Sequence, residues 1–373
     1  MRSVRRLYRN FHEHGEEMIT PAYEGCGHNQ PRQTRQELLE EARELREQHP
    51  TWGAPLIRVM MKQKRRRRQL PAARTLQRWF KKDAIPQAPC GRRPPATEDR
   101  AEQPHEVWQM DASEQIALRS GRHVSWLRVV DEWTGAVLET TVFGRGSFST
   151  VGASQVQAKL RAVFSRWGRP GRFRVDNGFP WGSRGDFPTD LALWLIGLEI
   201  AVSWNPPHQP QQNGVVERSQ GVGKSWAEPG ACRSPAELQR RLSKMDRIQR
   251  EQYPYRDGLS RIEAFPALKH SRRAYHAAWE EKHWNLDLVL EHLSQYLVSR
   301  RVDQAGLISI YNRNYYVGKH QQSKIVSVML DPLACQWVIL DEEGHQLRSH
   351  PAEQLARQRI VNLNVTHRRR KPK

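Results

Sequence analysis

The stretch HQPQQNGVVERS, residues 208–219, follows a predicted strand and leads into a predicted helix. The strand is EIAVSW, residues 199–204, and the helix is expected over residues 212–227. Glu217 therefore lies in the first turn of a helix, where a carboxylate stabilises the helix dipole. The alternative is that Glu217 is one of several carboxylates, drawn from distant parts of the chain, that hold a metal ion.

The segments before this stretch predict a mixed sheet. Three β segments come first, HEVWQMDAS, HVSWLRVVDEWTG and AVLETTVF, and a helix is expected over residues 151–167. RFRVDNG, residues 172–178, is a short strand that ends in an Asn-Gly turn, and LALWLIGL, residues 191–198, is an apolar helix candidate. The order β-β-β-α-β-α-β-α mixes a meander with crossovers, so we expect a mixed sheet with helices on its faces.

Three acidic residues occupy special places in these elements. Asp111 lies in the first strand between Met110 and Ala112, where a buried charge is costly unless it is paired. Asp176 ends the fourth strand, and Glu217 lies one turn into the last helix. Should the sheet bring the three together, divalent cations would neutralise them. Mg²⁺ prefers such oxygen ligands, and two ions about 4 Å apart can serve an in-line phosphoryl displacement.

Five other acids in the same region are alternatives on composition alone: Glu114, Asp131, Asp186, Asp190 and Glu199. Asp186 and Asp190 are interpreted as loop and helix-cap residues, because Pro-Thr-Asp precedes an apolar helix. Asp131 precedes a Trp-Thr-Gly turn, and we interpret it as structural.

WQMDAS, RVDNG and HQPQQNGVVER resemble the three acid motifs of the DDE superfamily, the insertion-sequence transposases and retroviral-type integrases. The resemblance to a bacterial insertion-element transposase covers nearly the whole chain and implies an α/β RNase H-like core with a mixed five-stranded sheet. It implies that Asp111, Asp176 and Glu217 are the catalytic metal ligands for two Mg²⁺ ions, for which Mn²⁺ can substitute. It also implies that Asn213 and Gly214 form the turn that presents Glu217.

The sequence departs from the family pattern at two places. Asp176 and Glu217 are separated by 40 residues, a few more than is usual, and we place the extra length in residues 178–190. Gln209 stands where relatives commonly have a histidine, with His208 one position earlier.

The helix of Glu217 also carries candidate DNA contacts. Lys224 comes seven residues after Glu217, close to two full turns, so both side chains share one face of the helix. We expect Lys224 to contact a DNA phosphate; the alternative is a solvated lysine. Arg218 points elsewhere and is expected to hold the helix or the DNA backbone.

Three predicted helices in residues 34–85 suggest an N-terminal helix-turn-helix domain, with residues 74–82 as the recognition helix. The exposed face of this helix is basic, and a dense run of basic residues precedes it. Like charges packed so closely repel one another unless an anion neutralises them, so this run favours DNA binding. The alternative is a small helical bundle with a basic surface. The expected DNA contacts are Arg65, Arg66, Arg67, Arg68, Arg74, Gln77, Arg78 and Lys81.

The remaining segments complete a seven-part division of the chain. Residues 1–33 are a basic segment, interpreted as the remnant of an upstream helix-turn-helix. After the helix-turn-helix domain we expect a proline-rich linker at 86–104, the catalytic core at 105–230, a helical connector at 231–295, a small β-barrel that binds DNA at 296–350, and a basic tail at 351–373.

The composition agrees with a nucleic-acid partner. The formal net charge is +20 over 373 residues, and each Lys or Arg that neutralises a phosphate releases a counterion. No stretch approaches the roughly 20 apolar residues of a membrane-spanning helix, and the four cysteines show no CxxC spacing. We therefore expect a cytoplasmic, nucleoid-associated bacterial protein without membrane contact.

These observations predict a DNA transposase that cleaves at element ends and transfers the 3′-hydroxyl into target DNA. Acting on two ends implies a homo-oligomer assembled on DNA. Two alternatives stay open: a catalytically inactive DNA-binding relative, and a metal-dependent nuclease that cuts without joining.

Overall fold

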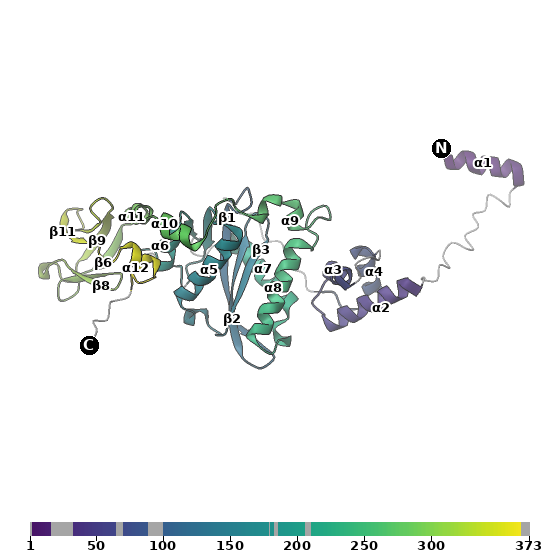
Figure 1. Cartoon of the computed structure of the whole chain (residues 1–373), viewed down its shortest axis with the longest axis horizontal. Coiled ribbons are helices and arrows are strands. Elements are labelled where there is room, and N and C mark those ends of the chain that lie inside the picture. Colours follow the sequence, from purple (N-terminus) through teal and green to yellow (C-terminus); the bar gives the residue numbers. More distant parts are fainter. Residues whose placement is uncertain are drawn as a thin grey trace. The chain divides into compact units, whose positions relative to one another are not determined.

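The computed structural model describes residues 2–15, 33–64, 70–88, 100–178, 180–182, 186–205 and 210–366 (Figure 1). The chain divides into two compact units, Met1–Pro89 and Cys90–Lys373, and each is treated by itself.

The first unit contains the three helices expected after residue 33. They are α2 (Gln33–Gln48), α3 (Ala54–Lys64) and α4 (Ala73–Lys82), which follow α1 (Arg2–His14). Each of the three buries its apolar face against the others, with Leu38 and Leu45 of α2, Ile57 of α3, and Leu76 and Phe80 of α4 in the interior. The helices and their apolar faces are confirmed, whereas the helix-turn-helix assignment stays a prediction.

The basic face of α4 lies where the sequence places it. Arg74, Gln77, Arg78 and Lys81 are all exposed on this helix. The arginine run that precedes α4 (Arg65, Arg66, Arg67 and Arg68) lies outside the described residues.

The second unit is built on a mixed five-stranded sheet, as predicted. Its strands are β1 (Val107–Ala117), β2 (His123–Asp131), β3 (Val137–Phe143), β4 (Arg172–Val175) and β5 (Ala201–Trp204). The order is β3-β2-β1-β4-β5; β1, β2 and β3 pair antiparallel, and β1, β4 and β5 pair parallel. This arrangement with flanking helices fits the RNase H-like core that the sequence resemblance implies.

Residues of β1 alternate between two apolar layers. Trp108 and Met110 point into the main core, where α5 (Ala153–Trp167) and α6 (Asp190–Gly197) pack. Gln109 and Asp111 belong to the opposite face, which is covered by α7 (Gly214–Ala227) and α8 (Pro235–Glu251). A register shift between Ser113 and Ile116 is typical of a bulge, which re-aims the side chains beyond it.

Helix α8 covers the free edge of the sheet at β3. The Gln239 amide donates to the Thr140 carbonyl and accepts from the Val142 N–H, at 2.7 Å each. Gln249 accepts from the Val137 N–H at 3.1 Å and donates to the Gly135 carbonyl at 2.8 Å. The two amides thus satisfy edge groups that would otherwise be free to pair with another strand.

The region after α8 is helical as expected and packs on the sheet unit. It comprises α9 (Arg261–Ala264), α10 (Ala277–His283) and α11 (Leu286–Ser294). Short 3-10 helices occur at Phe148–Thr150, Pro210–Asn213, Pro229–Ala231, Pro266–Lys269 and Lys319–Gln321. One apolar cluster contains Trp108 of β1, Leu293 of α11 and Trp337, which lies in a later strand (Gln336–Leu340). The residues after α8 therefore share this core with the five-stranded sheet.

The small β-barrel predicted for residues 296–350 is not confirmed. The strands are β6 (Val298–Arg301), β7 (Leu307–Ile310), β8 (Arg313–Tyr316), β9 (Ile325–Asp331), β10 (Gln336–Leu340) and β11 (Gln346–Pro351). They form a four-stranded sheet, β11-β10-β9-β6, and a separate β7-β8 hairpin, because β7 and β8 pair with each other while β6 pairs with β9.

The segment expected to be a basic tail is folded as far as Thr366. It includes α12 (Arg357–Val361), and its apolar side chains Leu355, Ile360 and Val365 are buried in the shared core. The segment folds although it is basic, because its apolar side chains enter the core while the arginines between them can stay at the surface. Across the described residues, no helix combines the length and the apolar character needed to cross a bilayer.

Candidate active site

Asp111 and Asp176 come from neighbouring parallel strands. β1 and β4 pair Val107 with Arg172 and Gln109 with Arg174. Continuing this register by two residues sets Asp176, directly after β4, level with Asp111 on β1. Adjacent strands lie about 4.8 Å apart, so two carboxylates far apart in the sequence meet at one place on the sheet.

Helix α7 brings Glu217 to the same place. The buried Gln109, two residues before Asp111, accepts from the Val216 N–H at 3.0 Å and donates to the Gln212 carbonyl at 2.9 Å. One amide therefore ties the start of α7 to β1. Gln220, one turn after Glu217, donates to the Asp111 carbonyl at 3.2 Å and to Asp111 Oδ2 at 3.3 Å.

The charges of Asp176 and Glu217 act on the carboxyl group of Asp111. The pKa of Asp111 is raised to about 6: burial is the largest cause, the hydrogen bond from Gln220 opposes it, and the negative charges of Asp176 and Glu217 add to it. Burial also raises the pKa of the Glu217 carboxyl. The charges of Asp176 and Glu217 thus make Asp111 harder to ionise.

The donor set suits a hard divalent cation. Among the described residues, no Lys or Arg forms an ion pair with Asp111, Asp176 or Glu217. In the described residues, carboxylate oxygens of these three acids do not all lie within 4.8 Å of one another. Ligands that flank two ions about 4 Å apart span a wider gap than ligands of one ion. Three uncompensated carboxylates with solvent access are the ligands that Mg²⁺ accepts.

The rival acids are all engaged elsewhere. Asp131 is buried and accepts from the His105 N–H at 2.6 Å and from the Thr134 N–H at 2.8 Å, so its structural interpretation is confirmed. The others bind the Phe148 N–H (Glu114), Arg300 (Asp186), the Val365 N–H (Asp190) and Arg169 (Glu199). Asp190 is the first residue of α6 rather than its cap, since Thr189 caps this helix.

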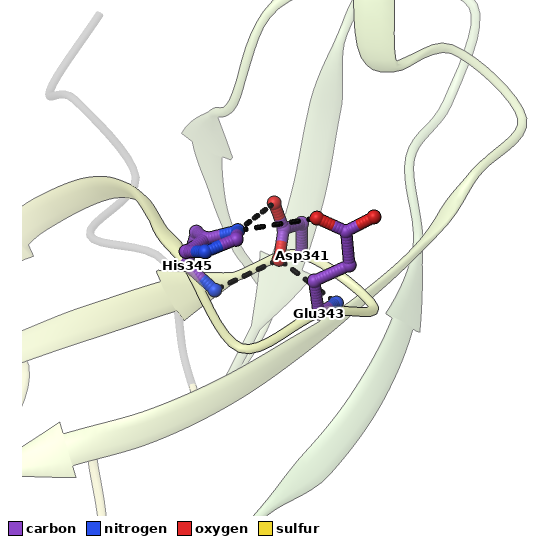
Figure 2. A group of neighbouring side chains, drawn as sticks. All are labelled: Asp341, Glu343 and His345. Carbon is purple, nitrogen blue, oxygen red and sulfur yellow. Dashed lines mark hydrogen bonds and ion pairs between the residues drawn. The ribbon is translucent and has the colours of Figure 1, made fainter.

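Within the described residues, one group of His, Cys, Asp or Glu has ligand atoms all within 4.8 Å of one another: Asp341, Glu343 and His345 (Figure 2). They lie between β10 and β11, where Asp341 Oδ1 accepts from the N–H groups of Glu343 at 3.0 Å and His345 at 2.8 Å. This is the geometry of a side-chain-stabilised turn. The turn accounts for the cluster without a metal ion.

Four further predicted site residues lie on or directly before the helix of Glu217. Lys224 and Arg218 are both exposed on α7. The predicted Asn213–Gly214 turn is instead a 3-10 helix, Pro210–Asn213, that runs directly into α7. Asn213 has a φ of −91° and so is not in the left-handed conformation typical of a tight Asn-Gly turn. A continuous helical segment therefore presents Glu217.

Four polar side chains at the site were not predicted: Gln109, Trp126, Trp181 and Gln220. Gln220 follows Glu217 at helical spacing, and this was a usable signal. Trp126 lies 94 residues from Gln220 along the chain, and no local pattern links the two.

No family model matches the chain. Among solved structures, the HTLV-2 integrase catalytic core domain in complex with magnesium is 17% identical over 46% of this chain and 100% of that one, with a TM-score of 0.34. The BIV integrase core is 20% identical over 45% and 98%, with a TM-score of 0.35. A simian T-cell lymphotropic virus intasome in complex with PP2A regulatory subunit B56 gamma is 16% identical over 75% and 89%, with a TM-score of 0.38.

The chain is thus similar to retroviral integrases. At TM-scores below 0.5 and these identities, the chemistry of the site has to be inferred from the residues themselves.

Proposed function

We propose that this protein is a metal-dependent polynucleotidyl transferase, and specifically the DNA transposase of an insertion element. The observation that carries the proposal is the convergence of Asp111, Asp176 and Glu217 on one face of the sheet with no cationic side chain to neutralise them. Partly buried carboxylates without a counter-charge lower the stability of the folded protein. A bound divalent cation would offset this cost.

The roles of the residues follow from their surroundings. Asp111, Asp176 and Glu217 would hold divalent cations, Mg²⁺ or Mn²⁺. When bound, such ions polarise a phosphodiester and lower the pKa of an attacking hydroxyl or water. Gln109 keeps α7 on β1, so Glu217 cannot drift from the two aspartates.

DNA is the substrate that the surrounding charge favours. Lys224 is exposed on the helix of Glu217, close to two turns further on, and can neutralise a backbone phosphate next to the acids. The exposed α4 residues Arg74, Arg78 and Lys81 offer a second basic surface, suited to binding element ends. Because two ends must be joined to one target, the active form is a homo-oligomer assembled on DNA.

The test is a strand-transfer assay with the full chain, Mg²⁺ and labelled duplexes that carry the inverted repeats flanking the gene. We expect cleaved ends and joined products, both lost in EDTA and both lost in Asp111→Asn. Products that are cut but never joined would identify the nuclease alternative instead. DNA binding without either product, or full activity of Asp111→Asn, would contradict the proposal.

A further inference from the structure

The carboxylate of Asp176 is held on one side by two N–H donors. Asp176 Oδ1 accepts from the Trp181 indole at 2.6 Å and from the Gly178 backbone N–H at 3.1 Å. Two donors occupy the acceptor directions of this oxygen. No such bond is formed to Oδ2 among the described residues. Asp176 therefore has one engaged oxygen and one that remains for a ligand.

Trp181 is itself held firmly. Its side chain is 1% exposed and lies 5.7 Å from the Phe148 ring, between ring centroids. Its carbonyl accepts from the Trp204 indole at 2.9 Å, and the Gly182 N–H donates to the Gly178 carbonyl at 2.7 Å. A Cβ on Gly182 would come within 2.1 Å of the Asn177 backbone, so glycine is required for this close return of the chain.

Asp111 is held in a similar way, through an intermediate residue. The Trp126 indole donates to Gln220 Oε1, and Gln220 Nε2 donates to Asp111 Oδ2 at 3.3 Å. An indole can only donate, so its bond requires the amide oxygen of Gln220 to face Trp126. The amide nitrogen must then face Asp111. Trp126 is fully buried and Gln220 is 5% exposed, so water cannot readily substitute for either bond.

We propose that Trp181 and the Trp126–Gln220 pair are positioning residues, each of which engages one oxygen of an active-site aspartate and leaves the other oxygen to a shared metal ion. The inference rests on the proposed function of the three acids. Hydrogen-bonded partners of this kind orient metal ligands, and their loss commonly costs about 10- to 100-fold in metal affinity or activity.

The contact between Trp181 and Asp176 gives a role to part of the 40-residue segment between Asp176 and Glu217. Trp181 lies within residues 178–190, the segment in which the additional length is expected from the sequence. Instead of forming an unrelated surface loop, the start of this segment turns back and places its indole on Asp176. The indole N–H is a neutral donor, so it orients the carboxylate without cancelling the charge that a cation needs.

The test uses the full chain with Trp181→Phe, Trp126→Phe and Gln220→Leu, compared with Trp284→Phe. Trp284 is a matched control, because it is 3% exposed and its indole donates at 3.0 Å to the Trp194 carbonyl, with no bond to the acids. Mn²⁺ binding is measured by electron paramagnetic resonance, urea unfolding measures stability, and steady-state cleavage separates kcat from KM for DNA.

We expect Trp181→Phe and Gln220→Leu to weaken Mn²⁺ binding and lower kcat by about tenfold or more, with an unchanged KM for DNA. Trp126→Phe should have a similar effect that disappears in the Gln220→Leu background, because both act through one contact. Trp284→Phe should lose comparable stability but keep wild-type Mn²⁺ affinity.

Two outcomes separate the inference from the proposed function. If Asp111→Asn abolishes Mn²⁺ binding but Gln220→Leu and Trp181→Phe bind Mn²⁺ as the wild type does, the positioning role is wrong and the metal site stands. If Asp111→Asn itself binds Mn²⁺ normally, the metal site fails first. Should Trp181→Phe not fold, Gln220→Leu and Trp126→Phe still test the same role at Asp111.

Discussion

Two groups of carboxylates within residues 90–373 differ in how their charges are compensated. Glu280 accepts from two guanidinium nitrogens of Arg161, Nη2 at 2.6 Å and Nε at 3.0 Å, and from the Trp194 indole at 2.9 Å. Asp246 pairs with the buried Arg128 at 3.0 Å. Asp111, Asp176 and Glu217 have no cationic partner in the described part of the chain. A cationic partner therefore accounts for the buried carboxylates of the first group, whereas no such partner accounts for the second group.

The largest expected effect concerns the uncompensated group. Asp176→Asn should lower strand transfer by at least about a hundredfold, because loss of a metal ligand should exceed the loss of an outer partner. Asp186→Asn, ten residues after Asp176 in the sequence, is the matched control, since Asp186 pairs with Arg300 at the surface. Cleavage assays in Mg²⁺ measure both. Equal activities would remove the distinction between the two groups.

The compensated group should behave in the opposite way. Glu280→Gln keeps the size of the side chain but leaves Arg161 without its counter-charge, so the free energy of unfolding should fall by about 2–4 kcal/mol. Urea unfolding gives this value, and cleavage per folded molecule should stay at the wild-type level. Lost cleavage with unchanged stability would show that the buried network takes part in the chemistry.

The pH dependence should separate the two groups further. Asp111 has a pKa of about 6 in the folded state and about 4 in an unfolded chain, so the folded state binds more protons between these values. Stability then falls as pH rises from about 4 to 6 and stays lower above that window. Asp111→Asn should therefore be more stable than the wild type above pH 6 in EDTA, by up to about 2 kcal/mol, although it is inactive.

Thermal unfolding in EDTA at pH 4 and pH 8 checks this sign. The difference between Asp111→Asn and the wild type should be small at pH 4 and favour the variant at pH 8. A variant that is less stable at both values would mean that the Asp111 charge is already compensated in the folded protein.

The smallest expected effect lies at the edge of the site. Lys224→Ala should reduce the slope of log affinity against log salt by about one, the release of a single counterion, with little change in stability at an exposed position. DNA titrations at several salt concentrations measure the slope. Lys282→Ala, at the end of the remote helix α10, is the control and should leave it unchanged.

Local pattern was sufficient for the order of the elements in the core. Apolar alternation located the five strands, and helical spacing located α5, α6 and α7, because both signals arise between residues a few positions apart. Asp111, Asp176 and Glu217 were also selected as candidate metal ligands from their motifs. The same reasoning failed for residues 351–366, where basic side chains hide the apolar ones that enter the core.

The amino-acid sequence by itself determined which residues can be strands, which can be helices, and which carboxylates are candidates for metal ligation. Only the tertiary structure decided which carboxylates remain uncompensated and what holds them. Asp190 bonds to Val365 across 175 residues and Trp126 to Gln220 across 94. Such partners are chosen by packing in space, and neither hydrophobic periodicity nor motif spacing carries information over that distance.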